Sequence, residues 1–134
     1  MASELRVNTL KDASGNNSVG MSYVAQVSAK AWAEIGSGGS SLPDSFNISS
    51  LDDDSTGEYG LNFSSAMTNA NYSATAVLTK DHSQSPAQGH RVTTPESKTT
   101  SSLEVSSGYV NTNGEYIDYD IDDNGNYVIH GDLA

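Results

Sequence analysis

The 134-residue sequence has no cysteine, few aliphatic side chains and few basic residues. Without cysteine the fold has no disulfide framework, and the redox compartment stays open. Leu, Ile, Val and Phe together make up only 18% of the chain, a value that with a large net charge is typical of disorder. Six basic against seventeen acidic residues give a net charge of −11, which disfavours nucleic acids and anionic membranes as partners. No apolar run is long enough to span a bilayer.

Against disorder stands a clear alternation of apolar and polar residues between positions 45 and 78. Period-2 alternation is typical of a half-buried antiparallel strand. We therefore predict three strands in a meander, with a turn at residues 52–57 and a corner of small residues at 64–71. The side chains expected on the buried faces are Phe46 and Ile48, then Tyr59, Leu61 and Phe63, then Tyr72, Ala74, Ala76 and Leu78.

The first 24 residues predict an arm, and residues 25–134 a β domain. Residues 5–9 and 19–23 alternate on either side of a turn at 12–17, which indicates a hairpin or two extended strands. Because a lone hairpin is marginal in water, we expect the arm to dock through Leu5, Val7 and Leu10. Residues 25–35 fit helix or strand; we favour a strand with Lys30 and Trp32 on one face, Trp32 lying in the core or in a subunit interface.

The last third of the chain predicts a second meander. Short strands are expected around residues 103–105, 109–110, 117–121 and 127–130, with turns at 106–108 and 111–114. Asn124-Gly125 is a strong type I′ hairpin signal. Asp120, Asp122 and Asn124 also match the first half of a calcium loop. The twelfth position of that loop is Gly131 rather than a bidentate Glu, so we favour a structural hairpin and keep calcium as the weaker alternative.

Residues 80–100 contain two prolines and a glycine without any periodicity, which predicts a long surface loop. His82 and His90 could hold a metal ion, although no further ligand pattern accompanies them. A recognition loop for a host sugar or protein fits better than a metal site, because loops on rigid scaffolds often carry recognition. The candidate binding residues are His82, Gln84, Gln88, His90 and Arg91.

Several short motifs give the chain a resemblance to a known family. They are LRVNTLKDASGNN near the N-terminus, Lys30-Ala31-Trp32, Asp44-Ser45-Phe46-Asn47, Gly57-Glu58-Tyr59, Asn62-Phe63, Ala66-Met67, Ala70-Asn71-Tyr72 and the closing Gly131-Asp132-Leu133-Ala134. With these motifs the chain resembles a module of structural proteins of tailed bacteriophages, notably those of marine bacteria. The module occurs at the ends of tail-fibre proteins and as short stand-alone virion proteins.

The resemblance covers both ends and the middle of the chain but not residues 81–102. It implies a β-rich, trimeric structural or host-attachment protein and carries over no catalytic residue. The chain departs from the family pattern at Ala33-Glu34-Ile35, where relatives have an aromatic-containing strand. It departs again at Pro43, where relatives have a basic residue. These differences affect the expected local interface rather than the fold.

We therefore expect an all-β protein, an antiparallel β-sandwich or jelly-roll-like module with an extended N-terminal arm, assembled as a trimer. Its expected role is non-enzymatic: a tail-fibre or receptor-binding virion protein. The alternatives are a capsid-decorating protein, of the cement or head-fibre type, and a fibre enzyme that degrades host polysaccharide. An enzyme is disfavoured because the sequence has no GxSxG elbow and no phosphate-binding glycine loop.

The expected partners are sister subunits, other virion proteins reached through the arm, and a host receptor or glycan. We expect no cofactor, no nucleic acid and no membrane insertion. The N-terminal residues lack the apolar centre of a signal peptide, so synthesis in the host cytoplasm without a leader and location on the tail or capsid surface are expected.

Overall fold

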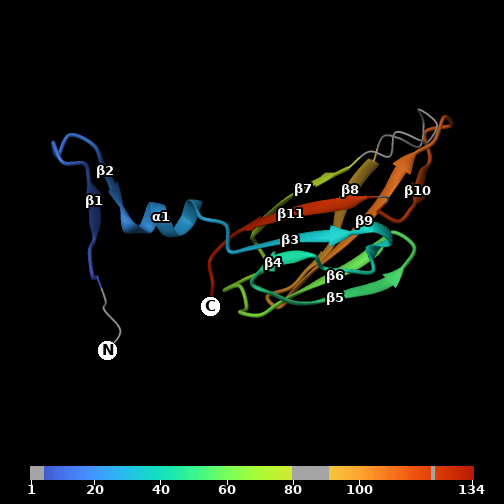
Figure 1. Ribbon diagram of the computed structural model, residues 1–134, viewed down its shortest axis with the longest axis horizontal. Coiled ribbons are helices and arrows are strands. Elements are labelled where there is room, and N and C mark those ends of the chain that lie inside the picture. The colour runs from blue at the N-terminus through green and yellow to red at the C-terminus, as the bar shows by residue number, and fades with distance from the viewer. Residues whose placement is uncertain (1–4, 80–90, 122) are drawn as a thin grey trace.

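The computed structural model describes residues 5–79, 91–121 and 123–134, and it is mostly β (Figure 1). One short helix, α1 (Met21–Val27), and one 3-10 turn, η1 (Ser37–Gly39), accompany the strands. The strands are β1 (Thr9–Lys11), β2 (Ser18–Gly20), β3 (Ala31–Gly36), β4 (Asp44–Phe46), β5 (Ile48–Ser55), β6 (Glu58–Phe63), β7 (Ser73–Leu78), β8 (Arg91–Lys98), β9 (Ser102–Val110), β10 (Tyr116–Asp118) and β11 (Asn124–His130).

The strands form three sheets, in which neighbouring strands pair antiparallel. β1 and β2 make a small hairpin. A five-stranded sheet has the order β10-β9-β6-β5, and β8 pairs with β9 as its fifth strand. A four-stranded sheet has the order β4-β3-β11-β7. The prediction of a mainly β protein built from antiparallel sheets is thereby confirmed.

Buried side chains of the two larger sheets and of the connections beside them form one apolar cluster. Tyr59, Leu61, Phe63 and Tyr72 belong to it, as their alternation predicts, and Ile48 packs against it. The ring of Phe63 meets that of Tyr72 edge-on, with the centroids 5.6 Å apart. The full cluster is Ala31, Ala33, Ile35, Tyr59, Leu61, Phe63, Met67, Tyr72, Leu103, Val105, Ile121, Tyr127 and Ile129.

Phe46 differs from its prediction: it is 51% exposed and does not share the buried face of Ile48. The reason is Asn47, whose φ of 58° lies in the left-handed region. One left-handed residue breaks the alternation, so β4 and β5 join different sheets on either side of it. The Asn47 side chain supports this corner, because its amide donates to the carbonyl oxygens of Lys30 and Ser65.

The predicted turn at residues 52–57 is shorter in the structure. β5 continues to Ser55, and only Thr56 and Gly57 form the turn into β6. Gly57 has a φ of 77°, and a Cβ there would lie 2.4 Å from the carbonyl oxygen of Ser107. The position therefore requires glycine for two reasons, the left-handed backbone and the lack of room for a Cβ. The acidic residues expected in the turn instead lie on β5, the edge strand of its sheet, where charge discourages further strand pairing.

Each predicted meander is confirmed in one strand pair and wrong in the rest. β5 pairs antiparallel with β6, and β9 pairs with β10 across the predicted turn at 111–114. β7 does not continue the sheet of β5 and β6; it pairs with β11 in the other sheet. The predicted turn at 106–108 lies inside β9, and Asn124-Gly125 begins β11 rather than forming a hairpin turn. Gly125 serves close packing, because a Cβ there would lie 2.8 Å from Cδ2 of Leu78.

The predicted loop at residues 80–100 is also too long. Its second half contains β8, which pairs with β9 on one side only. Pro95 is tolerated there because an edge strand can lose one donor. The register of β8 against β9 shifts directly after Pro95.

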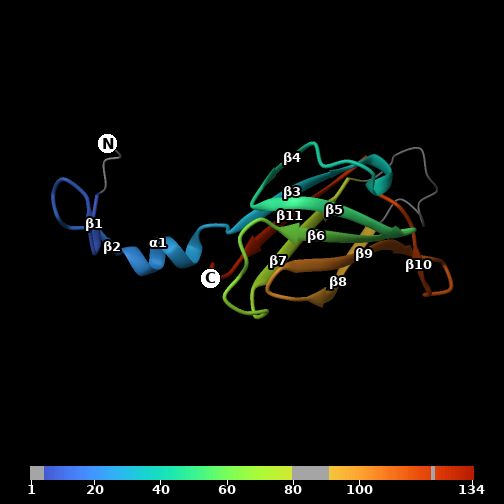
Figure 2. The same ribbon diagram turned by 90° about the horizontal axis from the view of Figure 1, so that it is seen from below.

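The N-terminal segment (residues 5–29) lies to one side of the two larger sheets (Figures 1 and 2). Its hairpin is confirmed: β1 pairs with β2 across a turn in which Asp12 accepts hydrogen bonds from Asn16 and Asn17. Two predictions fail here. Met21 and Tyr23 belong to α1 rather than to a strand, and the strand expected over residues 25–35 begins only at Ala31.

Candidate functional site

The N-terminal segment exposes its large apolar side chains to solvent. None of the residues of α1 is buried, and no residue of the segment belongs to the core cluster. The predicted docking residues Leu5, Val7 and Leu10 are exposed by 81%, 36% and 44%. On α1, Tyr23 and Val27 stand four residues apart, hence on one side of the helix, and are 65% and 70% exposed.

The secondary structure of the N-terminal segment is short and weakly stabilised. The strands of the hairpin are three residues long, and α1 has seven residues and no side-chain cap at its N-terminus. Two-stranded hairpins and helices this short are marginal in water unless other surfaces cover them. The segment therefore combines exposed apolar side chains with short elements that contribute little stability of their own.

Lys30 fixes the junction between this segment and the sheets. Its ammonium group donates to the carbonyl oxygen of Ala25 and, over 2.6 Å, to the hydroxyl oxygen of Ser28. The carbonyl group of Ala25 lies near the C-terminal end of α1, where a cation also interacts favourably with the helix dipole. The backbone N–H of Lys30 donates to Ile129 of β11 over 2.8 Å, so one residue ties the segment to the four-stranded sheet.

The outer face of the four-stranded sheet, opposite the core, carries a second exposed apolar surface. Ala31, Ala33 and Ile35 of β3 are buried, so Trp32 points to the outer face. Trp32 pairs with Phe46 on one side and with Val128 on the other. We call Phe46, Trp32 and Val128 the outer row.

The outer row has an acidic border. Glu34 lies two residues after Trp32 on β3, hence on the same face, and it pairs with Asp44 of β4. Glu34 accepts a hydrogen bond from the amide of Asn124 over 3.1 Å. Trp32, predicted for the core or an interface, is thus a half-buried residue of an exposed sheet face. Sequence reasoning missed the row because its members come from three strands.

Two of the three residues of the weak calcium candidate, Asp120 and Asn124, make hydrogen bonds within the protein. Oδ1 of Asp120 accepts hydrogen bonds from the backbone of Gly57 and from the hydroxyl group of Tyr59. The amide group of Asn124 bridges Glu34 and Thr79, and Asp122 lies outside the described residues. Burial raises the pKa of Tyr59 to about 12, and the negative charge of Asp120 adds to this effect. This arrangement holds a turn and a loop together.

Most of the predicted recognition loop, with His82, Gln84, Gln88 and His90, lies outside the described residues. Arg91, its last member, begins β8, and its guanidinium carbon lies 4.3 Å from the ring centre of Tyr119 and 5.7 Å from that of Tyr109. Such stacking of a cation on aromatic faces orders the start of the strand.

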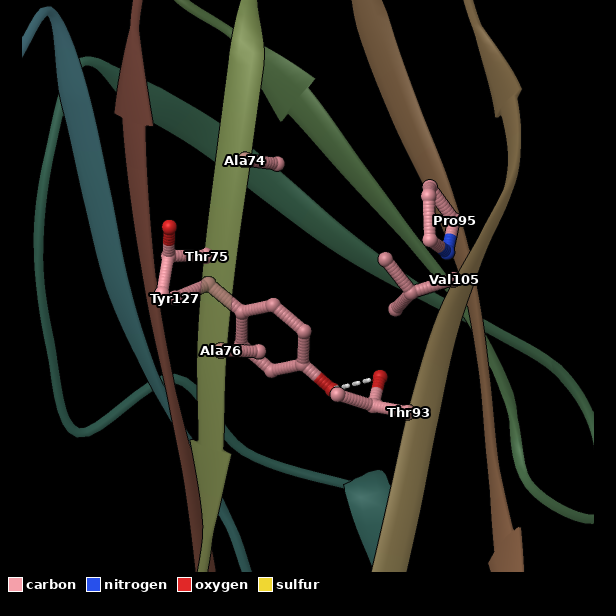
Figure 3. A pocket seen from close by; sticks show the side chains of 7 residues that line it. All are labelled: Ala74, Thr75, Ala76, Thr93, Pro95, Val105 and Tyr127. Carbon is pink, nitrogen blue, oxygen red and sulfur yellow. Dashed lines mark hydrogen bonds between the residues drawn. The ribbon is translucent and has the colours of Figure 1, made fainter.

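A small cavity opens between the edge strands β7 and β8, one from each larger sheet (Figure 3). Its volume is about 50 Å³, which is room for a water molecule or two and not for an organic ligand. The ring of Tyr127 reaches across it, and its hydroxyl group lies 3.3 Å from Oγ1 of Thr93 (Figure 3). The lining residues are Ala74, Thr75, Ala76, Thr93, Pro95, Val105 and Tyr127.

The part of the chain that the structure describes has neither a cluster of metal ligands nor a membrane-spanning helix. Within the described ranges, His, Asp and Glu side chains nowhere gather in a group of three or more that could hold a metal ion. In that same part of the chain, no helix has the length and apolar character needed to cross a membrane.

Comparisons with known proteins yield no relative: the chain matches no family model, no curated protein and no solved structure. Its exposed surfaces therefore carry the functional argument.

Proposed function

We propose that this chain is a non-enzymatic structural protein of a bacteriophage virion, of the tail-fibre or receptor-binding type, that joins the particle through its N-terminal segment. The observation that carries the attachment mode is the exposure of the segment's large apolar side chains, from Leu5 to Val27, outside the core. The virion setting rests on the resemblance of the sequence motifs to tailed-phage structural modules.

Two further features of the proposal concern architecture. We propose that the five-stranded and four-stranded sheets form a β-sandwich around their shared cluster, with the N-terminal segment as a docking arm. We also propose that three copies assemble on the particle. The accessible surface of 8045 Å² exceeds the roughly 6,700 Å² expected for a compact monomer of 14.1 kDa, so extra surface is available to other subunits. The projecting segment is one source of this excess.

The attachment mode is tested by changing the segment in the phage that carries the protein. Deleting residues 2–24 is expected to abolish incorporation into particles and to leave a soluble β domain, because no core residue is lost. A finer variant replaces Leu5, Val7 and Leu10 by Ser. The matched control replaces Val92 and Val110, exposed by 37% and 46% on the five-stranded sheet, by Ser. Normal incorporation of the deleted chain would refute the docking arm.

Counting copies per particle tests the place of the protein on the virion. A few trimers at the tail agree with host attachment. Copy numbers that follow the number of capsomers would replace this proposal by capsid decoration. Release of new reducing ends from host polysaccharide would instead show a degradative enzyme.

A further inference from the structure

The N-terminal segment and the outer row are both exposed apolar surfaces, but the charges around them differ in sign. The N-terminal segment, residues 5–29, contains two basic residues and one acidic residue, a formal charge of +1. Residues 30–134 contain four basic and fifteen acidic residues, a formal charge of −11. The outer row lies within this acidic part, beside Asp44 and Glu34. A cationic apolar segment and an acidic apolar sheet face complement each other.

We propose that the N-terminal segment of one chain covers the outer row of a second copy. Tyr23 and Val27 on one side of α1 supply the apolar contact, and Phe46, Trp32 and Val128 receive it. The exposed Lys11 of β1 adds a cation that suits the acidic border. This inference rests on the proposed docking role of the segment and names its first partner as a sister subunit.

The segment cannot cover the outer row of its own chain without breaking its junction. Only three residues separate the end of α1 from the start of β3. The bonds of Lys30 to Ala25 and Ser28 hold that junction in the direction in which the segment leaves the sheets (Figures 1 and 2). A contact with the next copy keeps these bonds. Such head-to-tail contact closes into a ring if the rotation between subunits permits, which is compatible with a trimer.

The test uses full-length chains with one surface changed at a time. The arm variant carries Tyr23→Ser and Val27→Ser; the face variant carries Phe46→Thr and Val128→Thr. Wild type is expected to self-associate in analytical ultracentrifugation, and each variant alone is expected to associate about tenfold more weakly or not at all. An equimolar mixture is expected to recover a heterodimer, because one chain keeps the arm and the other keeps the face.

Trp32 gives a direct reading of the contact, since it is the only tryptophan. With Trp32→Phe added to the face variant, the mixture holds a single tryptophan, on the intact outer row of the arm variant. Its emission is expected to shift to shorter wavelength, and its quenching by acrylamide to fall, as the face variant is titrated in. The matched control carries Val92→Thr and Val110→Thr and is expected to associate like wild type.

Three results would overturn the inference: a wild type that stays monomeric at high concentration, a variant that associates as wild type does, or a mixture without recovery. Circular dichroism checks that each variant keeps its β signal; if the face variant loses it, Val128→Thr alone replaces it. These measurements need no virion. A monomeric chain that still enters particles would refute this inference alone, and a self-associating chain absent from particles would refute the proposed function alone.

Discussion

The hydroxyl group of Tyr59 lies 3.2 Å from Oδ1 of Asp120 and accepts a hydrogen bond from the backbone N–H of Ile121 over 3.1 Å. Tyr59 is fully buried on β6, and Asp120 lies in the connection between β10 and β11. The same carboxylate binds the backbone of Gly57 at the β5–β6 turn. One phenol and one carboxylate thus join two loops that lie far apart in the sequence.

Replacing Tyr59 by Phe is expected to lower the free energy of unfolding by about 1–3 kcal/mol. The ring would still fill its place in the core, but the buried N–H of Ile121 would lose its acceptor. Urea unfolding measures the change. Tyr23→Phe, at a position 65% exposed, is the matched control and is expected to stay within about 0.5 kcal/mol of wild type. Equal effects of the two substitutions would contradict the role of the Tyr59 hydroxyl group.

Alkaline solution is expected to destabilise the fold through its buried tyrosines. Burial raises the pKa of Tyr59 and of Tyr72 to about 12, against 10.0 for an unperturbed tyrosine. The folded state therefore keeps protons that the unfolded state releases, so stability is full below pH 10 and falls as the pH rises toward 12. Absorbance at alkaline pH should show these two phenols ionising only as the chain unfolds. Simple titration of all seven tyrosines near pH 10 in a folded chain would contradict this.

The two phenylalanines provide a direct comparison of buried and exposed positions. Phe63 is 8% exposed within the core, so Phe63→Ala is expected to cost about 3–5 kcal/mol of unfolding free energy. Phe46 is 51% exposed on the outer row, and Phe46→Ala is expected to change the stability of the monomer by less than about 1 kcal/mol. Thermal unfolding at low concentration measures both. An unchanged melting temperature for Phe63→Ala would show that the core is placed wrongly.

Asn47 combines a left-handed backbone with three side-chain hydrogen bonds, two to carbonyl oxygens and one from the N–H of Ser65. Asn47→Ala is expected to destabilise the chain by about 2–4 kcal/mol, since it loses these bonds and disfavours the left-handed region. Asn47→Gly loses the same bonds but adopts the backbone freely, so it should cost about 1 kcal/mol less. Equal costs would mean that backbone conformation does not matter at this corner.

Local alternation predicts burial well where a strand is regular. Tyr59, Leu61 and Phe63 lie on one strand without a break, and the structure buries all three. Phe46 and Ile48 have the same spacing, yet the left-handed Asn47 between them turns Phe46 outward. The side-chain pattern alone does not reveal such a backbone change, although Asn is one of the residues that tolerates it.

Strand pairing is harder to predict, because it depends on contacts between distant parts of the chain. β7 follows β6 in sequence but pairs with β11, and Gly125 marks close packing against Leu78 rather than a turn. The outer row also depends on pairing between strands that are distant in the sequence. The sequence places Trp32 opposite the buried face of its strand, but only the register of β4 and β11 brings Phe46 and Val128 beside it.

Glu104 on β9 faces Gly60 of β6, and a Cβ at that glycine would lie 2.9 Å from Oε2 of the carboxylate. Burial raises the pKa of Glu104, and the charges of Asp54 and Asp52 on β5, the edge strand beyond β6, add to this. Folding therefore favours the protonated form of Glu104. The stability of the folded state falls as the pH rises through the folded pKa and this proton is lost. At neutral pH the ionised carboxylate destabilises the sheet.

Glu104→Gln is accordingly expected to raise the melting temperature at pH 7, because the amide keeps the shape of the side chain without its charge. The gain should shrink on acidification and vanish below the unperturbed pKa of 4.5, where both chains carry a neutral group at this position. Asp132→Asn removes the same single negative charge at a position outside β9 and is the control for a general charge effect. A gain that is equal in the two variants, or that persists at low pH, would contradict the local explanation.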